Sequence, residues 1–172
     1  MKLLNKLYIV LLVTSTSLSA YAVEKASVAR LDEIAKRGAK VMPFNLEQTV
    51  HVFLKKQDGG LQQVIVKNES NSGQIKLIRE HLAEISKKFK QGDFSDPMTI
   101  HGKNMPGLEA LKNSIQGEIN IKYTKLSNGA QIYYSTDKPV LIHAIHQWFD
   151  AQLSDHSRHA MPHPQHHLMH TQ

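Results

Sequence analysis

Apolar and polar residues alternate in two stretches of the chain, and each stretch is interrupted by a turn sequence. Residues 48–54 alternate and are rich in β-branched side chains; Asp58-Gly59-Gly60 follows as a turn, and residues 61–66 resume the pattern. Residues 119–134 alternate on either side of Ser127-Asn128-Gly129, whose residue types suit a two-residue turn. Each stretch is therefore predicted to form a β-hairpin.

Other stretches repeat their apolar residues every three or four positions, which is the spacing of one helical face. Two further helices are predicted at 106–113 and from Pro139 onward, and the N-terminal segment 23–43 is also predicted to contain a helix, which ends at Met42-Pro43. The clearest helix lies between Gly73 and Gly92, where one face contains Ile75, Ile78, Leu82, Ile85 and Phe89.

The predicted order of elements after the N-terminal segment is ββααββα. Two hairpins with helices between them favour an α+β fold of two layers, in which a four-stranded antiparallel sheet carries helices on one face. A chain of 172 residues with 41% apolar residues has the size and composition of one globular domain.

The ends of the chain differ from this middle. Residues 1–22 contain Lys2 and Lys6, a short apolar run and Ala20-Tyr21-Ala22, the pattern of a cleaved secretory signal peptide. The run is too short for a membrane span of about 20 residues, so we expect export to the periplasm without a stable membrane anchor. The predicted parts are a signal peptide (1–22), an N-terminal segment (23–43), the α+β domain (44–154) and a flexible His/Met-rich tail (155–172).

Composition removes several classes of function. The chain has no cysteine, which excludes disulfides, thiolate metal sites and cysteine nucleophiles. Loss of Lys2 and Lys6 with the signal peptide lowers the formal charge from +6 to +4, which is too little for a nucleic-acid footprint. No serine-hydrolase, zinc-protease, phosphate-loop or dinucleotide motif is present, so no catalytic residue is predicted. The unusual count is 11 histidines, which points to metal or proton chemistry.

One candidate metal site lies on the last predicted helix. His143 and His146 are three residues apart and Asp150 follows four later, so all three share a stripe roughly 60° wide. Two imidazoles and a carboxylate supply part of a metal site, with a further donor from elsewhere. The alternative is that this stripe is the solvated flank of an amphipathic helix.

A second group of candidates lies in the middle of the chain. His81 is at the border of the apolar face of the 73–92 helix, as a ligand or as a core histidine. His101 is followed by Met105, and a histidine with a thioether suits Cu(I), although Met105 could instead fill the core. His51, on the first hairpin, is predicted to be structural.

The C-terminal segment contains the densest group of candidate metal ligands in the sequence. Asp155 precedes His156 directly, so its carboxylate could orient an imidazole or simply cap the helix end. Imidazoles suit copper, zinc and nickel, and divalent copper binds most tightly. The nitrogen and thioether donors of this segment are His156, His159, Met161, His163, His166, His167, Met169 and His170.

Four strings of residues, at 78–82, 92–97, 100–108 and 146–156, resemble a functionally uncharacterised family of small exported bacterial proteins. The resemblance covers about residues 43–159. Some members carry the label aspartate carbamoyltransferase, but the chain lacks the S-T-R-T loop of that enzyme, so the activity is not carried over. The positions that match the family strings are His81, His101, Met105, His146, Asp155 and His156.

These observations predict a periplasmic metal-binding protein that captures or delivers ions. Copper is the expected metal, with zinc or nickel as alternatives. The folded site would draw on His81, His101, Met105, His146 and His156, and the tail would add further donors. The competing prediction is a periplasmic interaction or envelope-stress module whose histidines are structural or respond to pH. No protein partner is identified by the sequence.

Overall fold

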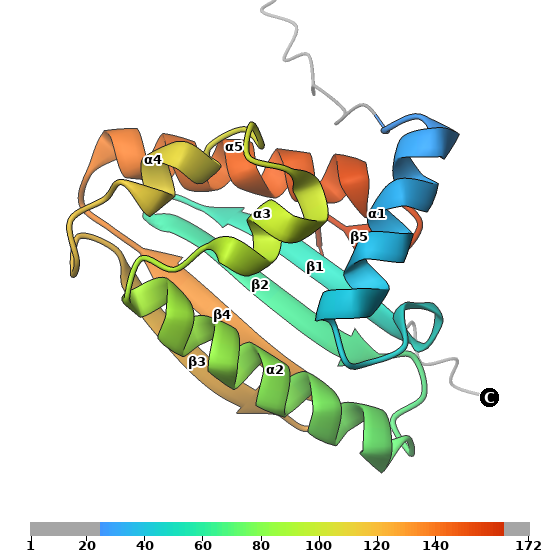
Figure 1. Cartoon of the computed structure of the whole chain (residues 1–172). Helices are drawn as coiled ribbons and strands as arrows, with labels where there is room; N and C mark the ends of the chain where they lie inside the picture. The colour runs from blue at the N-terminus through green and yellow to red at the C-terminus, as the bar shows by residue number, and fades with distance from the viewer. Residues whose placement is uncertain (1–24, 164–172) are drawn as a thin grey trace, which may run out of the picture.

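The computed structural model describes residues 25–163, in which helices pack against one face of a β-sheet (Figure 1). Helix α2 lies along β3 and β4, and α5 lies along β1 and β2. The elements in chain order are α1 (Val28–Val41), η1 (Leu46–Gln48), β1 (Thr49–Lys56), β2 (Gly59–Val66), α2 (Ser72–Lys90), α3 (Ser95–His101), α4 (Leu108–Lys112), β3 (Asn120–Leu126), β4 (Gly129–Ser135), α5 (Pro139–Asp155) and β5 (Ala160–Met161).

Both predicted hairpins are confirmed. β1 pairs antiparallel with β2 from Thr49 opposite Val66, and β3 pairs antiparallel with β4 up to Leu126 opposite Gly129. The hairpins join through β2 and β4, which are also antiparallel. The sheet order is β3-β4-β2-β1-β5. The fold is therefore α+β, as the patterning predicted.

The sheet differs from the prediction in having a fifth strand, which makes it mixed. β5 runs parallel to β1, with His51 opposite Ala160, and the His51 N–H donates to the His159 carbonyl at 2.8 Å. A strand of two residues is too short to show an alternating pattern in the sequence. It is defined only by its pairing with the edge strand β1. Helix α1 lies within the N-terminal segment predicted to be helical, but the order ββααββα after that segment is incomplete, because α3 adds a helix where none was expected.

The C-terminal boundary also moves. α5 continues to Asp155, and the His156 N–H donates to the Gln152 carbonyl at 2.9 Å before the chain turns into β5. Folded structure thus extends past the boundary predicted after residue 154, at least to Met161. The predicted signal peptide and four donors of the predicted tail, His166, His167, Met169 and His170, lie outside the described residues.

Aromatic side chains from both long helices meet in the core. Phe149 of α5 and Phe89 of α2 both contact Tyr134 of β4, so both helices lie on the same face of the sheet. Trp148, beside Phe149, is almost completely buried. Each buried aromatic of this kind contributes about 2–3 kcal/mol of hydrophobic stabilisation. None of the helices within residues 25–163 combines the length and apolar character of a membrane span.

Gly60 sets how closely α5 can approach β2. A Cβ at this position would overlap the Phe149 ring, which is fully buried and has little room to move. We expect Gly60→Ala to lower the free energy of unfolding by about 1–3 kcal/mol through overpacking, measured by urea denaturation. Gly73→Ala is the matched control: its Cβ would have only Asn71 Oδ1 within 4 Å, at 3.8 Å, so stability should stay within about 1 kcal/mol. Equal effects of the two substitutions would contradict this account.

Candidate functional site

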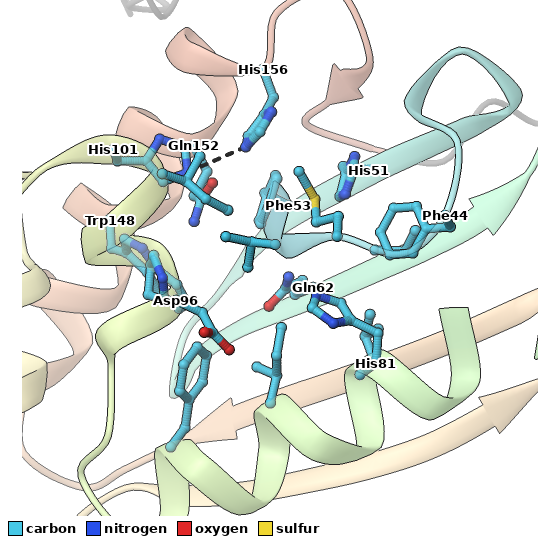
Figure 2. A pocket seen from close by; sticks show the side chains of 18 residues that line it. Phe44, His51, Phe53, Gln62, His81, Asp96, His101, Trp148, Gln152 and His156 are labelled. Carbon is cyan, nitrogen blue, oxygen red and sulfur yellow. Dashed lines mark hydrogen bonds between the residues drawn. The ribbon is translucent and has the colours of Figure 1, made fainter. Parts of the chain in front are cut away.

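A small buried cavity brings four histidines together from separate elements (Figure 2). Its volume of about 50 Å³ has room for an ion or a few water molecules, since one water needs about 10–15 Å³. Organic ligands occupy pockets of about 300–1,000 Å³, so the cavity does not fit a substrate of that size. The four histidines are His51 on β1, His81 on α2, His101 at the end of α3 and His156 after α5.

Local structure explains how each histidine reaches the cavity. His51 lies two residues from Phe53 on β1, so both side chains lie on the face of the sheet that packs against the helices. His81 is on the buried face of α2 beside Leu82. His101 is the last residue of α3, which ends where Gly102 follows with a φ of 94°, and His156 is the first residue after the end of α5.

His101 and His156 face each other across the cavity wall. Their Nε2 atoms are 3.3 Å apart, and the rings are nearly perpendicular at 84° (Figure 2). The other ring nitrogen of His101, Nδ1, lies 2.8 Å from Asp155 Oδ2. Because an ionised carboxylate only accepts hydrogen bonds, Nδ1 carries the proton and a neutral His101 presents the Nε2 lone pair to His156.

Arg30 of α1 completes this arrangement from the outside. Its Nε and Nη2 donate to the two oxygens of Asp155 at 3.1 and 2.8 Å, and Nη2 also donates to the His101 carbonyl at 2.7 Å. Burial raises the pKa of Asp155, but hydrogen bonds from His101 and Arg30 outweigh it and hold the pKa at about 2. Asp155 is therefore ionised at neutral pH and fixes the His101 ring.

The remaining histidines are also uncharged at neutral pH. Burial lowers the pKa of His81 and His101, and it takes the pKa of His156 well below its ordinary value. For His101 the nearby Asp155 opposes this effect without reversing it. Burial, with smaller contributions from neighbouring histidines, lowers the pKa of His51 to about 3. Neutral imidazoles are the form that binds metal ions.

Two polar atoms of residues that line the cavity lack a partner. His51 stacks on His156, with ring centroids 5.3 Å apart, but its Nδ1 makes no hydrogen bond with protein atoms of residues 25–163. Trp148 Nε1 is buried in the same way. Buried polar groups are nearly always paired; Trp148 Nε1–H can only donate and so suits water, whereas His51 Nδ1 can meet either water or a metal ion.

The predicted stripe on α5 is not assembled into a site. His146 Nε2 lies 2.9 Å from the carbonyls of both Lys56 and Gly59, so it donates to them and fastens the β1–β2 turn to α5. Asp150 pairs with Lys55, and His143 is exposed. Within residues 25–163, no group of three or more His, Asp or Glu side chains is arranged to hold a metal ion.

Other predicted donors also lie apart from the cavity. Met105 is buried in the core and lines a neighbouring surface cleft, whereas Met42 is the methionine that lines the cavity. His159 Nε2 is 2.8 Å from Glu47 Oε1. Met161 belongs to β5, and His163 is exposed. Of the predicted ligands, His81, His101 and His156 therefore line one cavity, with Asp155 behind His101.

Sequence reasoning missed His51, Met42 and Arg30. The alternation of β1 placed His51 on the same strand face as Phe53. That pattern could predict a core position for His51, but it could not predict which other histidines surround it. Arg30 and Asp155 are 125 residues apart, and no local pattern links them. Comparison with family models, curated proteins and solved structures gave no match to this chain, so the resemblance described above stays a prediction.

The burial of His51 predicts a pH dependence of stability. Its pKa is about 3 in the folded protein and 6.5 ordinarily, so the unfolded chain binds more protons below pH 6.5. Stability is thus complete above that pH and falls as the pH decreases, by about 2 kcal/mol at about pH 5 for His51 alone. Urea denaturation across this range measures it.

His51→Phe is the informative variant because it retains an aromatic ring beside Phe53 and removes the titrating group. We expect its stability loss between about pH 7.5 and pH 5 to be smaller than that of the wild type by about 2 kcal/mol. His143→Ala, at an exposed position, is the control and should keep the wild-type slope. An unchanged slope in His51→Phe would refute the assignment.

Proposed function

We propose that this protein is an exported, periplasmic metal-binding protein that takes up copper at the His101–His156 pair. The observation that carries the proposal is the pair of facing Nε2 atoms 3.3 Å apart, with Asp155 bound to the far nitrogen of His101. Zinc and nickel are the alternative metals, because imidazole also suits both.

The spacing of the pair agrees with shared ligation. Two nitrogens bound to one tetrahedral ion at about 2.0–2.1 Å lie roughly 3.3 Å from each other. Histidine ligands usually donate their other ring N–H to a carboxylate, which fixes the tautomer and orients the ring. Asp155 makes this contact with His101 at 2.8 Å.

The rest of the cavity adds donors of the same class. His51 Nδ1 is buried without a protein partner, and His81 and Met42 line the same space. Imidazole and thioether donors together favour copper, because thioethers suit Cu(I) and imidazole binds Cu(II) more tightly than other divalent ions. Further ligation of an ion held by the pair would come from this set after small side-chain rotations.

The donors near the C-terminus would act as a second, weaker set. His163 is exposed, and the sequence continues with His166, His167, Met169 and His170. We propose that these residues capture ions ahead of the buried pair. A set of this kind would bind with low selectivity, because its composition and not a defined geometry supplies the ligands.

A second candidate function is a pH-responsive interaction module. It is favoured by the lowered pKa of all four cavity histidines, together with the lack of a ready three-ligand group in residues 25–163. In that case His101 and His156 share an N–H···N hydrogen bond and protonation separates them. Metal ions would then leave the melting temperature of the folded domain unchanged.

Calorimetric titration of the full chain with Cu(I), Cu(II), Zn(II) and Ni(II) tests the proposal. A parent variant with His163, His166, His167 and His170 all changed to Gln isolates the buried site. We expect this parent to retain one copper site and to gain about 2.7 kcal/mol of stability at a copper concentration 100 times the Kd.

Substitutions in that parent locate the site. His156→Ala should abolish the copper site, and Asp155→Asn should weaken it by about 10–100-fold because His101 loses its orienting partner. His143→Ala should have no effect, since this side chain is exposed and far from the pair in the fold. Loss of all copper affinity in the parent itself would refute the buried site and leave only binding near the C-terminus.

A further inference from the structure

A surface cleft lies on the outer side of the histidine pair. It has a volume of about 690 Å³, and its lining includes Arg30, His101 and Asp155. His101 also lines the inner cavity, so this residue lies between the two spaces. The inner cavity is also lined by core residues, among them Phe53, Leu82 and Trp148, and on its other side by the partly buried Val41 and Asp96.

The Arg30 side chain covers the cleft side of His101, held there by hydrogen bonds that its guanidinium donates. Its guanidinium spans the two oxygens of Asp155 and the carbonyl of His101, while its own side chain remains 32% exposed. Behind it, the His101 side chain is 1% exposed. Arg30 and Asp155 therefore lie between the cleft and the buried His101 ring.

The first turn of α1, which carries Arg30, has no buried residue, although the Ala26 N–H just before it donates to the Ser154 carbonyl at 3.4 Å. The buried residues of α1 are Ile34 and Gly38, both beyond its first turn, and Val28 is 68% exposed. The first turn of α1 can therefore move without exposing core residues. Few buried apolar contacts are the general mark of a segment that opens locally.

We propose that Arg30 is the gate of the histidine pair, and that ions reach the pair from the cleft when Arg30 releases Asp155. The identity of the ion rests on the proposed function. A guanidinium repels an approaching cation, and its departure presents the Asp155 carboxylate to the cleft, which attracts the cation. Arg30 thus acts as a positioning residue that sets the rate of exchange more than the affinity.

A second approach to His156 passes between α1 and the segment after α5. It is a much smaller pocket of about 10 Å³, lined by Leu31, Ile34 and His159 among others. Arg158 pairs with Asp32 on this side at 2.8 Å. Arg158→Gln therefore distinguishes a general loosening of α1 from the release of Asp155 by Arg30. The matched control is Arg37→Gln, which removes an exposed ion pair with Glu33 on α1.

The first experiment needs no metal. The full chain is treated with diethylpyrocarbonate, and acylation of each histidine is followed by peptide mass spectrometry. Arg30→Gln should raise the rate at His101 by about tenfold or more, while His51, deeper in the cavity, stays at its wild-type rate. Arg37→Gln and Arg158→Gln should match the wild type, and Arg30→Lys should restore part of the protection.

An unchanged His101 rate in Arg30→Gln overturns the gate. An equal increase in the His101 acylation rate in Arg158→Gln also overturns it, because loosening of α1 would then be enough to expose His101. A parallel increase at His51 overturns it as well, since it would show loss of the whole fold. These outcomes do not depend on whether the protein binds copper.

The second experiment follows ion arrival. Trp148 is the single tryptophan and lines the cavity, so quenching of its fluorescence by Cu(II) in stopped flow reports arrival at the pair. In Arg30→Gln the association and dissociation rates should both rise by about tenfold, with the Kd changed by less than about threefold. A changed Kd with an unchanged association rate overturns the gate, whereas absence of Trp148 quenching in the wild type overturns the proposed function.

Discussion

The candidate site depends on one partly buried carboxylate, that of Asp155. It is held between the Arg30 guanidinium and the His101 ring, and those contacts keep its pKa at about 2 despite burial. A buried charge is tolerated only when it is paired and hydrogen-bonded. Because Asp155 is ionised, His101 must place its proton on Nδ1, and the direction of the Nε2 lone pair toward His156 follows from that.

The same carboxylate connects the site to the fold. Asp155 is the last residue of α5, Arg30 belongs to the first turn of α1, and His101 is the last residue of α3. Three helix ends therefore meet at one ion pair. The cavity behind them is small and contains four imidazoles that remain neutral, an arrangement that costs stability as the pH falls and leaves lone pairs free for ligation.

The elements of the fold were largely readable from local patterns. Alternation with Asp58-Gly59-Gly60 and Ser127-Asn128-Gly129 predicted both hairpins, and the spacing of Ile75 to Phe89 predicted α2, because each signal lies within one element. β5 could not be predicted from the sequence, since its two residues form a strand only by pairing with β1. For the same reason the end of the domain moved from residue 154 to at least Met161.

The sequence by itself determined which chemistry is available: many imidazoles, thioethers and no thiol, with Asp155 directly before His156. It also placed His81 at the border of the apolar face of its helix and predicted a structural role for His51. Only the tertiary structure decided which of these groups meet. His101 and His156 are 55 residues apart and Arg30 and Asp155 are 125 apart, whereas His143 and His146, adjacent on one helix face, serve no common centre. Spacing along the chain describes one helix or strand, but convergence depends on how those elements pack, which no local pattern encodes.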